Sequence, residues 1–179
     1  MTRYRRAAFS TTFFFTLVTH RHRAILCEDV TRNSLRDAIA TVREARPFSV
    51  DAWVLLPDHV HCIWTLPDGD GDYSTRWAQI KRSVSRDCRA VFHDPAQLSD
   101  SGRKHRESTI WQRRYWEHCI RDENDFERHV DYIHFNPVRH GYVERVSEWP
   151  YSTFHRYVRS GNYARDWAGG PELARFEWE

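Results

Sequence analysis

The sequence predicts an α+β protein of ferredoxin-like type, in which helices back an antiparallel sheet. Three observations support this fold class. Strand-type and helix-type patterns follow one another in the order strand, helix, two strands, helix, strand, helix. The two consecutive strands are joined at a hairpin signal. The chain of 179 residues, 40% hydrophobic and 29% charged, has the composition of an ordinary globular protein.

The first part of the chain supplies a strand, a helix and a hairpin. Residues 10–20 are rich in β-branched and aromatic side chains, which is typical of a buried strand. Residues 29–47 carry apolar side chains at helical spacing, and the helix closes at Pro47. Residues 48–66 indicate two strands that are hinged near Pro57, and an acidic loop with glycines follows.

The next part is predicted to contain a second helix, a loop and a strand. Within residues 73–92, apolar side chains recur every three or four positions, as on the buried face of a helix. These side chains are Trp77, Ile80, Val84, Cys88 and Val91. Residues 93–106 are polar and contain Gly, Pro and Ser, which indicates a mobile loop, and residues 108–120 alternate as a strand does.

A third helix and an irregular tail complete the predicted fold. Residues 123–138 carry apolar side chains at helical spacing. We expect Pro137 to end this helix, because the residue before a proline is pushed out of the α region. The tail is rich in Trp and Tyr but has weak periodicity. We therefore expect one domain over residues 1–141 and an irregular C-terminal extension, residues 142–179, that packs on it.

Positive charge is segregated along the chain, although the formal net charge is only +2. The first 24 residues contain five arginines and no acidic residue, and a second basic run covers residues 102–114. Segregated positive charge favours a polyanionic partner, although a charge run is also common on an ordinary solvated face.

Cysteine usage and hydropathy predict the compartment. The four cysteines are scattered and form no CxxC pair, which argues against a zinc knuckle and against a disulfide framework. The apolar run 13–18 is far too short to span a bilayer, and its flanks do not resemble those of a signal peptide. We therefore expect a cytoplasmic protein with reduced thiols and no membrane partner.

Two histidines lie two positions apart in the second strand of the hairpin. Because side chains alternate along a strand, His59 and His61 point to one face, and Val60 and Cys62 point to the other. Two imidazoles on one face can grip a divalent metal or a phosphate. The alternative is that both histidines lie on a half-exposed face and have no function.

The third helix offers a tyrosine and an amide at helical spacing. Tyr132 and Asn136 are four positions apart, so they share a face and their Cβ atoms lie roughly 5–6 Å apart. The amide oxygen of Asn136 could complete a metal site begun by the two histidines, and this ligand set suits Mg²⁺ or Mn²⁺. A nearby cation would favour the phenolate of Tyr132. The alternative is that Tyr132 packs on the sheet and that Asn136 ends the helix.

Several ordered motifs carry a resemblance to a known family. The segments "LPDHVHCIWTLP", "WQRRYWEHCIRDENDFERHVDYIHFNPVRHG" and "WPYSTFHR", together with the early "YRR", resemble the REP-associated tyrosine transposases. These are relatives of the small single-strand insertion-sequence transposases, which have a His-hydrophobic-His motif. The resemblance extends from Tyr4 to Gly169, nearly the whole chain.

The resemblance implies a metal-dependent single-stranded DNA endonuclease and strand transferase. In that family the two motif histidines and a polar side chain one turn after the tyrosine bind the metal. Carried over to this chain, His59, His61 and Asn136 would bind Mg²⁺ or Mn²⁺. Tyr132 would be the nucleophile that forms a 5′-phosphotyrosine. The wider insertion-sequence group has Gln at the third ligand position, and the shorter arm of Asn requires the helix to lie closer to the sheet.

The resemblance also implies a substrate and an assembly. The family cleaves at repeated extragenic palindromic hairpins, next to a tetranucleotide at the hairpin foot. The REP-associated branch resembles monomers, whereas the wider group works as dimers in which tyrosine and histidines come from different chains. Both assemblies stay open at this point.

Basic and aromatic side chains outside this site are candidates for DNA contacts. By analogy with the family, Arg5 and Arg6 would help to read the tetranucleotide. Arginines before the last strand would contact phosphates, and neighbouring aromatic rings would stack on unstacked bases. These residues are Arg113, Arg114, Trp111, Tyr115 and Trp116. For the two arginines, a solvated strand edge is the alternative.

Other functions fit the sequence less well. A histidine-triad nucleotide hydrolase needs a third histidine where the chain has Ile63, and a structural zinc site is disfavoured because Cys62 faces away from the two histidines. The serious alternative is a non-catalytic protein that binds single-stranded DNA hairpins on a transposase fold. The presence of all four proposed active-site residues argues against it. Tyr115 ranks below Tyr132 as a nucleophile, because it has no metal-ligand partner at helical spacing.

Overall fold

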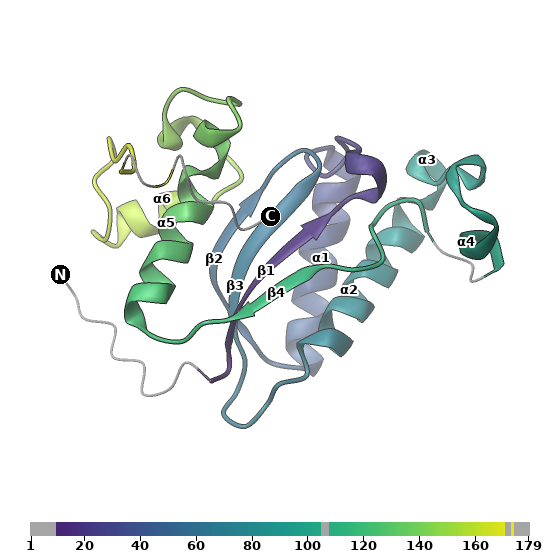
Figure 1. The fold of residues 1–179 in the computed structure, drawn as a ribbon, viewed down its shortest axis with the longest axis horizontal. Coiled ribbons are helices and arrows are strands. Elements are labelled where there is room, and N and C mark those ends of the chain that lie inside the picture. The colour runs from purple at the N-terminus through teal and green to yellow at the C-terminus, as the bar shows by residue number, and fades with distance from the viewer. Residues whose placement is uncertain (1–9, 105–107, 171–172, 174–179) are drawn as a thin grey trace.

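The computed structural model describes residues 10–104, 108–170 and 173, and a four-stranded sheet forms its centre (Figure 1). The strand order is β2-β3-β1-β4, and all neighbouring strands are antiparallel. The strands are β1 (Thr12–Val18), β2 (Ser49–Leu55), β3 (His59–Thr65) and β4 (Trp116–Cys119). The predicted α+β fold of ferredoxin-like type is therefore confirmed, and the strand with the two histidines lies inside the sheet.

Helices cover both faces of this sheet (Figure 1). The long helices α1 and α2 pack on one face, and α5 packs on the other. Their bounds are α1 (Asp29–Ala45), α2 (Tyr73–Asp87) and α5 (Glu123–Arg139). The shorter helices are α3 (Arg89–Phe92), α4 (Asp100–Lys104), α6 (Phe154–Arg159) and the 3₁₀ turns η1 (His20–His22), η2 (Pro95–Gln97) and η3 (Val146–Glu148). Among the described residues, none of the helices is both long and apolar enough to cross a membrane.

Each face of the sheet has its own hydrophobic core, because side chains alternate along the strands. In β1, Phe15 packs toward α1 and α2, whereas Phe14 packs toward α5. On the α1/α2 side, the buried rings of Trp64 and Trp77 stack with centroids 3.9 Å apart. Much of the aromatic content of the chain therefore fills the core.

The second predicted helix is interrupted. α2 ends at Asp87, and Cys88 has φ −88° and ψ 0° between α2 and α3. The break turns Val91 outward, so that it is 62% exposed instead of lying on the buried face as predicted. The segment that follows, predicted as a loop, contains η2 and α4.

The last strand is shorter than predicted and the last helix is longer. Ile110 and Trp111 are adjacent, yet both are buried in the core on the α1/α2 side, which a regular strand does not allow because adjacent side chains point to opposite faces. Strand β4 therefore covers only the end of the predicted segment. α5 continues past Pro137 to Arg139, because the backbone N–H of His140 still donates to the carbonyl oxygen of Asn136 at 3.0 Å. The expected stop at Pro137 is wrong.

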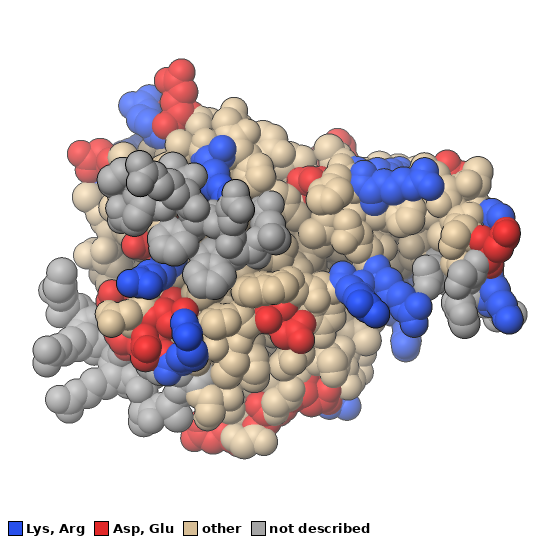
Figure 2. Space-filling view, viewed as in Figure 1, with Lys and Arg blue, Asp and Glu red and all other residues tan. Residues whose placement is uncertain are grey.

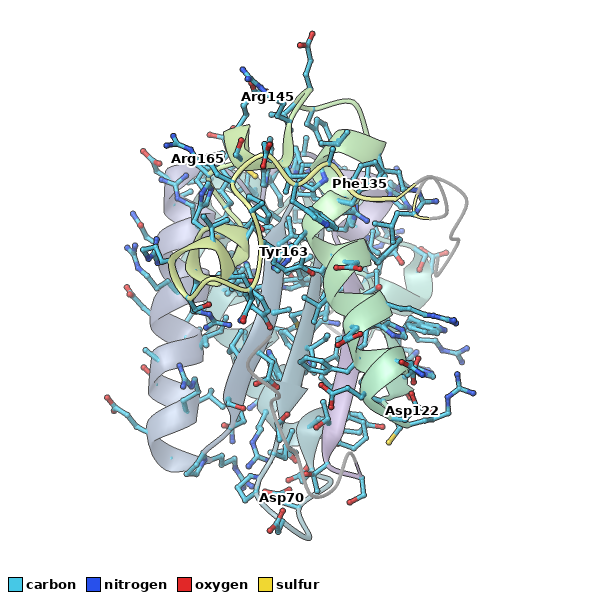
Figure 3. All side chains as sticks on the ribbon, turned by 90° about the vertical axis from the view of Figure 1, so that its left-hand side faces the viewer. Asp70, Asp122, Phe135, Arg145, Tyr163 and Arg165 are labelled. Carbon is cyan, nitrogen blue, oxygen red and sulfur yellow. The ribbon has the colours of Figure 1, made fainter. Side chains whose placement is uncertain are left out.

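The C-terminal extension lies along the edge strand β2. The backbone N–H of Leu55 donates to the carbonyl oxygen of Tyr151, and that of Thr153 donates to the carbonyl oxygen of Trp53, each at 2.9 Å. Farther along the extension, Tyr163 lies beside α5 (Figure 3), where its hydroxyl donates to Asp131 of that helix. The extension thus covers an otherwise open sheet edge, while the domain boundary between residues 141 and 142 stays a prediction.

Candidate active site

The two histidines of β3 form a buried pair on the α5 face of the sheet. Their ring centroids are 4.8 Å apart, His59 is 5% exposed and His61 is fully buried. Val60 and Cys62 belong to the core on the opposite face, as the strand alternation predicts. The alternative of a half-exposed, functionless face does not fit this burial.

Each histidine is oriented by a hydrogen bond at Nδ1. His61 Nδ1 lies 2.8 Å from Thr16 Oγ1, because Thr16 on β1 is its partner in the sheet register. His59 Nδ1 lies 2.7 Å from Asp58 Oδ1 in the tight turn between β2 and β3. With Nδ1 held in this way, Nε2 is the nitrogen with which each ring would bind a metal.

Asp58 also contacts His22, whose Nδ1 lies 3.0 Å from Asp58 Oδ2. Burial alone would raise the pKa of Asp58, but the hydrogen bonds from His59 and His22 outweigh it and hold this pKa below its usual value. The carboxylate is therefore charged at neutral pH and favours an Nδ1–H donor on His59.

Helix α5 brings the tyrosine to the histidines. Asp122 caps the helix by accepting a hydrogen bond from the backbone N–H of Asp125 at 2.9 Å, and Ile133 packs into the core beneath it. This places Tyr132, which is 1% exposed, with its ring centroid 5.2 Å from that of His61. Tyrosine and histidine of one chain are thus in direct contact.

Asn136 lies on α5 between two contacts with the histidine pair. One turn before it Tyr132 touches His61, and one turn after it the ring of His140 lies 5.0 Å from that of His59. Asn136 is fully buried, and neither Oδ1 nor Nδ2 has a hydrogen-bond partner among the described residues. A buried amide in this state is costly unless a ligand satisfies it. Two imidazoles and one such oxygen fit a divalent cation of the Mg²⁺ or Mn²⁺ type.

Arg139 was not anticipated from the sequence. Its Nη1 donates to the Tyr132 hydroxyl at 3.0 Å, and its guanidinium lies 5.4 Å from the centroid of the tyrosine ring. The spacing of seven residues within a helix is a signal that could have identified it, because residues i and i+7 share a face. Thr16 gave no such signal, since its contact depends on the register of β1 against β3.

A second cluster of possible ligands lies where β4 meets the start of α5. One ligand atom from each of His118, Asp125 and His129 falls within 4.8 Å of the others, so this His/Asp group could hold a metal. The same atoms already form hydrogen bonds: His118 Nε2 lies 2.8 Å from Asp125 Oδ2, and His129 Nδ1 lies 2.7 Å from the backbone oxygen of Asp125. Burial would raise the pKa of Asp125, but hydrogen bonds from His118 and Arg121 lower it to about 2. Sequence reasoning missed this group.

The candidate DNA contacts fall in different environments. Trp111 is 5% exposed and packs in the core on the α1/α2 side, so its predicted role as a base-stacking ring is wrong. Tyr115 is half-buried against the same core, and burial raises its pKa to about 12. Because that core lies on the face opposite the histidines, Tyr115 is excluded as an alternative nucleophile. Arg113 and Arg114 are exposed just before β4.

The surface charge is uneven on the face shown in Figure 2. Lys and Arg side chains predominate on its right-hand part, where α2, α3 and α4 lie in Figure 1, whereas acidic and basic side chains are mixed on the left. Arg5 and Arg6, predicted to read a tetranucleotide, lie outside the described residues, so their role stays a prediction.

Comparisons with known proteins agree with this geometry. The family model described as "Transposase IS200 like" matches residues 7–136. A REP-associated tyrosine transposase of Escherichia coli (strain K12) is 48% identical over 158 residues, which cover 88% of this chain and 85% of that protein. A solved structure of a REP-associated tyrosine transposase bound to a REP hairpin is 45% identical with a TM-score of 0.74, and the match covers 95% of this chain and 93% of that one. The chain therefore belongs to the IS200-like transposases and, among these DNA-processing enzymes, to the REP-associated tyrosine transposases.

Proposed function

We propose that the protein is a metal-dependent single-stranded DNA endonuclease and strand transferase that acts at repeated extragenic palindromic hairpins. The observation that supports this most directly is the contact of Tyr132 with His61, with Asn136 one turn farther along the same helix. A tyrosine hydroxyl is therefore buried beside two imidazoles, and the buried amide follows it on the same helix. The 45% identical relative whose structure is described as bound to a REP hairpin supports the choice of substrate.

His59, His61 and Asn136 would hold Mg²⁺ or Mn²⁺, and the bound cation would stabilise the charge that develops on a scissile phosphate. The oxygen of Tyr132 attacks phosphorus and its proton passes to solvent. The bond to the 3′ oxygen breaks, and that oxygen takes up a proton to become a 3′-hydroxyl. Because one phosphate ester replaces another, a second 3′-hydroxyl reverses the step and joins strands without ATP.

Arg139 supports the attacking oxygen in this proposal. Its guanidinium donates to the Tyr132 hydroxyl at 3.0 Å and would stabilise negative charge there. Asp58 and Thr16 hold the two histidines in place. Thus Tyr132 and both histidines are each held by a second side chain.

One chain suffices for this site. Tyr132 touches His61 of the same chain, so no second copy is needed to supply the nucleophile. This supports a monomer rather than the dimeric exchange of the wider group.

A non-catalytic protein that binds DNA hairpins is the second candidate. The observation that favours it is that Tyr132 is 1% exposed, with its hydroxyl already bonded to Arg139. Cleavage therefore requires this end of α5 to open toward the DNA, whereas simple binding does not.

The experiment that separates the two candidates is a covalent trapping assay. The protein is mixed with Mn²⁺ and with 3′-labelled single-stranded hairpins drawn from palindromes flanking its own gene, and run on a denaturing protein gel. Because a 5′-phosphotyrosine keeps the 3′ fragment on the protein, we expect a labelled protein band.

Three variants make this assay specific. Tyr132→Phe and His59→Ala should each abolish the band, and Tyr115→Phe is the matched control that should keep it. Tight metal-stimulated binding without a band on any hairpin would favour the binding protein instead.

A further inference from the structure

Trp116 stands out among the aromatic side chains of the structure. It is 39% exposed, whereas most other large rings of the described residues are buried or half-buried. In the sheet register it pairs with Thr16, and Thr16 pairs on its other side with His61. The three side chains therefore form one row across the α5 face, and two strand spacings, about 10 Å, separate the tryptophan from the histidine backbone.

The indole of Trp116 is held by a stack of rings. It lies parallel to the ring of His118, with centroids 5.9 Å apart and 6° between the planes. His118 in turn stacks on His129 of α5 at 4.9 Å and 15°. Phe14 supports the indole at its edge, with centroids 5.6 Å apart. We call Trp116, His118 and His129 the aromatic shelf.

Asp125 locks the shelf to the start of α5. Its carboxylate lies 2.8 Å from His118 Nε2 and 3.3 Å from His129 Nδ1, so both imidazoles are fixed by one buried acid. The low pKa of Asp125 keeps that acid charged. A ring fixed in advance loses little entropy when a second flat group stacks on it, which favours binding.

We propose that the aromatic shelf is a stacking site for one unpaired base of the DNA strand whose phosphate lies at His59 and His61. This inference rests on the proposed function and adds a base-binding position to it. Trp116 lies in the same sheet row as His61, one of the two histidines, and only the width of Thr16 on β1 separates them. Base–aromatic stacking needs an exposed ring face and is tolerant of sequence, so the shelf takes a flanking base of a single strand rather than a paired one.

Positive charge beside the shelf suits the same occupant. Arg121 pairs with Asp125 at 3.3 Å while its side chain stays 71% exposed, and Arg113 and Arg114 are exposed just before Trp116. A DNA strand that runs from the histidine pair toward β4 would therefore pass these arginine side chains, and one of its bases would stack on the indole of Trp116.

The test is a double-mutant cycle that combines changes in the DNA with changes at Trp116 and measures binding. All proteins carry Tyr132→Phe, so that cleavage does not occur during the measurement. Hairpin oligonucleotides with single-stranded flanks carry one abasic nucleotide, moved position by position, and their Kd values are measured by fluorescence anisotropy. At one flank position the abasic change should weaken binding about 5- to 150-fold, the range expected for loss of one stacked base. Trp116→Leu should weaken binding of the intact hairpin by the same factor. In this variant, the abasic change at that flank position should cause no further loss of affinity.

The matched variant is Trp116→Phe, which keeps a flat ring and should retain most of the affinity. Trp116→Leu keeps apolar contact with Phe14 but has no ring face, and its thermal unfolding shows whether the fold is intact. An unchanged abasic profile in folded Trp116→Leu, with the parent binding hairpins, overturns this inference alone. A parent protein without affinity for any hairpin overturns the proposed function and this inference together.

Discussion

Thr16 offers a test of the site that leaves every proposed ligand in place. Thr16→Val keeps the shape of the side chain but removes the Oγ1 that lies 2.8 Å from His61 Nδ1. Both residues are buried, so the change leaves an imidazole nitrogen without its partner, which costs about 1–3 kcal/mol of unfolding free energy. Loss of such an orienting contact also weakens metal binding, typically by about 10- to 100-fold.

The same strand provides the control. Thr12 is also buried on β1, and its Oγ1 lies 2.9 Å from Thr65 Oγ1 of β3, but it stands four residues, or roughly 13 Å, from Thr16. Thr12→Val should therefore leave metal binding unchanged, and it should lower stability less than Thr16→Val does, because Thr65 Oγ1 keeps its hydrogen bond to Asp51.

The assay is the Mn²⁺ dependence of covalent hairpin trapping, with urea unfolding measured in parallel. We expect a half-saturating Mn²⁺ concentration about 10- to 100-fold higher for Thr16→Val, and the wild-type value for Thr12→Val. Equal shifts in the two variants, or no shift in Thr16→Val, would refute the argument that the Thr16 contact positions a metal ligand.

Two further predictions concern stability away from the site. Burial lowers the pKa of Lys81 to about 8, and between this value and its unfolded pKa the unfolded chain binds more protons, so stability should rise with pH. Between pH 7.5 and pH 9.5, the free energy of unfolding measured in urea should increase by about 1–2 kcal/mol more for wild type than for Lys81→Met. Equal increases in the two proteins would contradict this prediction. Gly169 has φ +74°, and a Cβ there would lie 2.7 Å from the ring of Phe135, whereas at Gly161, with φ +75°, nothing lies within 4 Å. Gly169→Ala should therefore lower the melting temperature more than Gly161→Ala, and equal losses would show that only φ matters.

The fold was predictable where patterns are local. The alternation around Phe14 and Phe15 and the helical spacing of Leu35 and Val42 correspond to real faces, since these side chains are buried in the structure. The prediction failed where tertiary contacts decide. Val91 fits the helical spacing, but the chain breaks at Cys88 before reaching it. Ile110 and Trp111 lie in a segment with a strand-like pattern, but both side chains are buried in the same core.

The site was predictable to the extent that its residues share an element. His59 and His61 on one strand, and Tyr132 and Asn136 on one helix, follow from the periods of those elements. The side chains that orient them depend on how separate elements meet. Thr16 reaches His61 only through the register of β1 against β3, and no local spacing indicates this. The same holds for the aromatic shelf, whose members come from β4 and α5.

The C-terminal extension has a structural consequence for the chemistry. Thr153 of the extension lies 3.0 Å from His134 Nε2 on α5, and its hydroxyl accepts from the backbone N–H of Trp53 on β2 at 2.8 Å. Burial lowers the pKa of His134 to about 3, so the link stays neutral at physiological pH. β2 pairs with β3, which carries both histidines, and His134 is two residues from Tyr132 and from Asn136. The extension therefore ties α5, which carries the proposed nucleophile, to the sheet that carries the two histidines proposed as metal ligands.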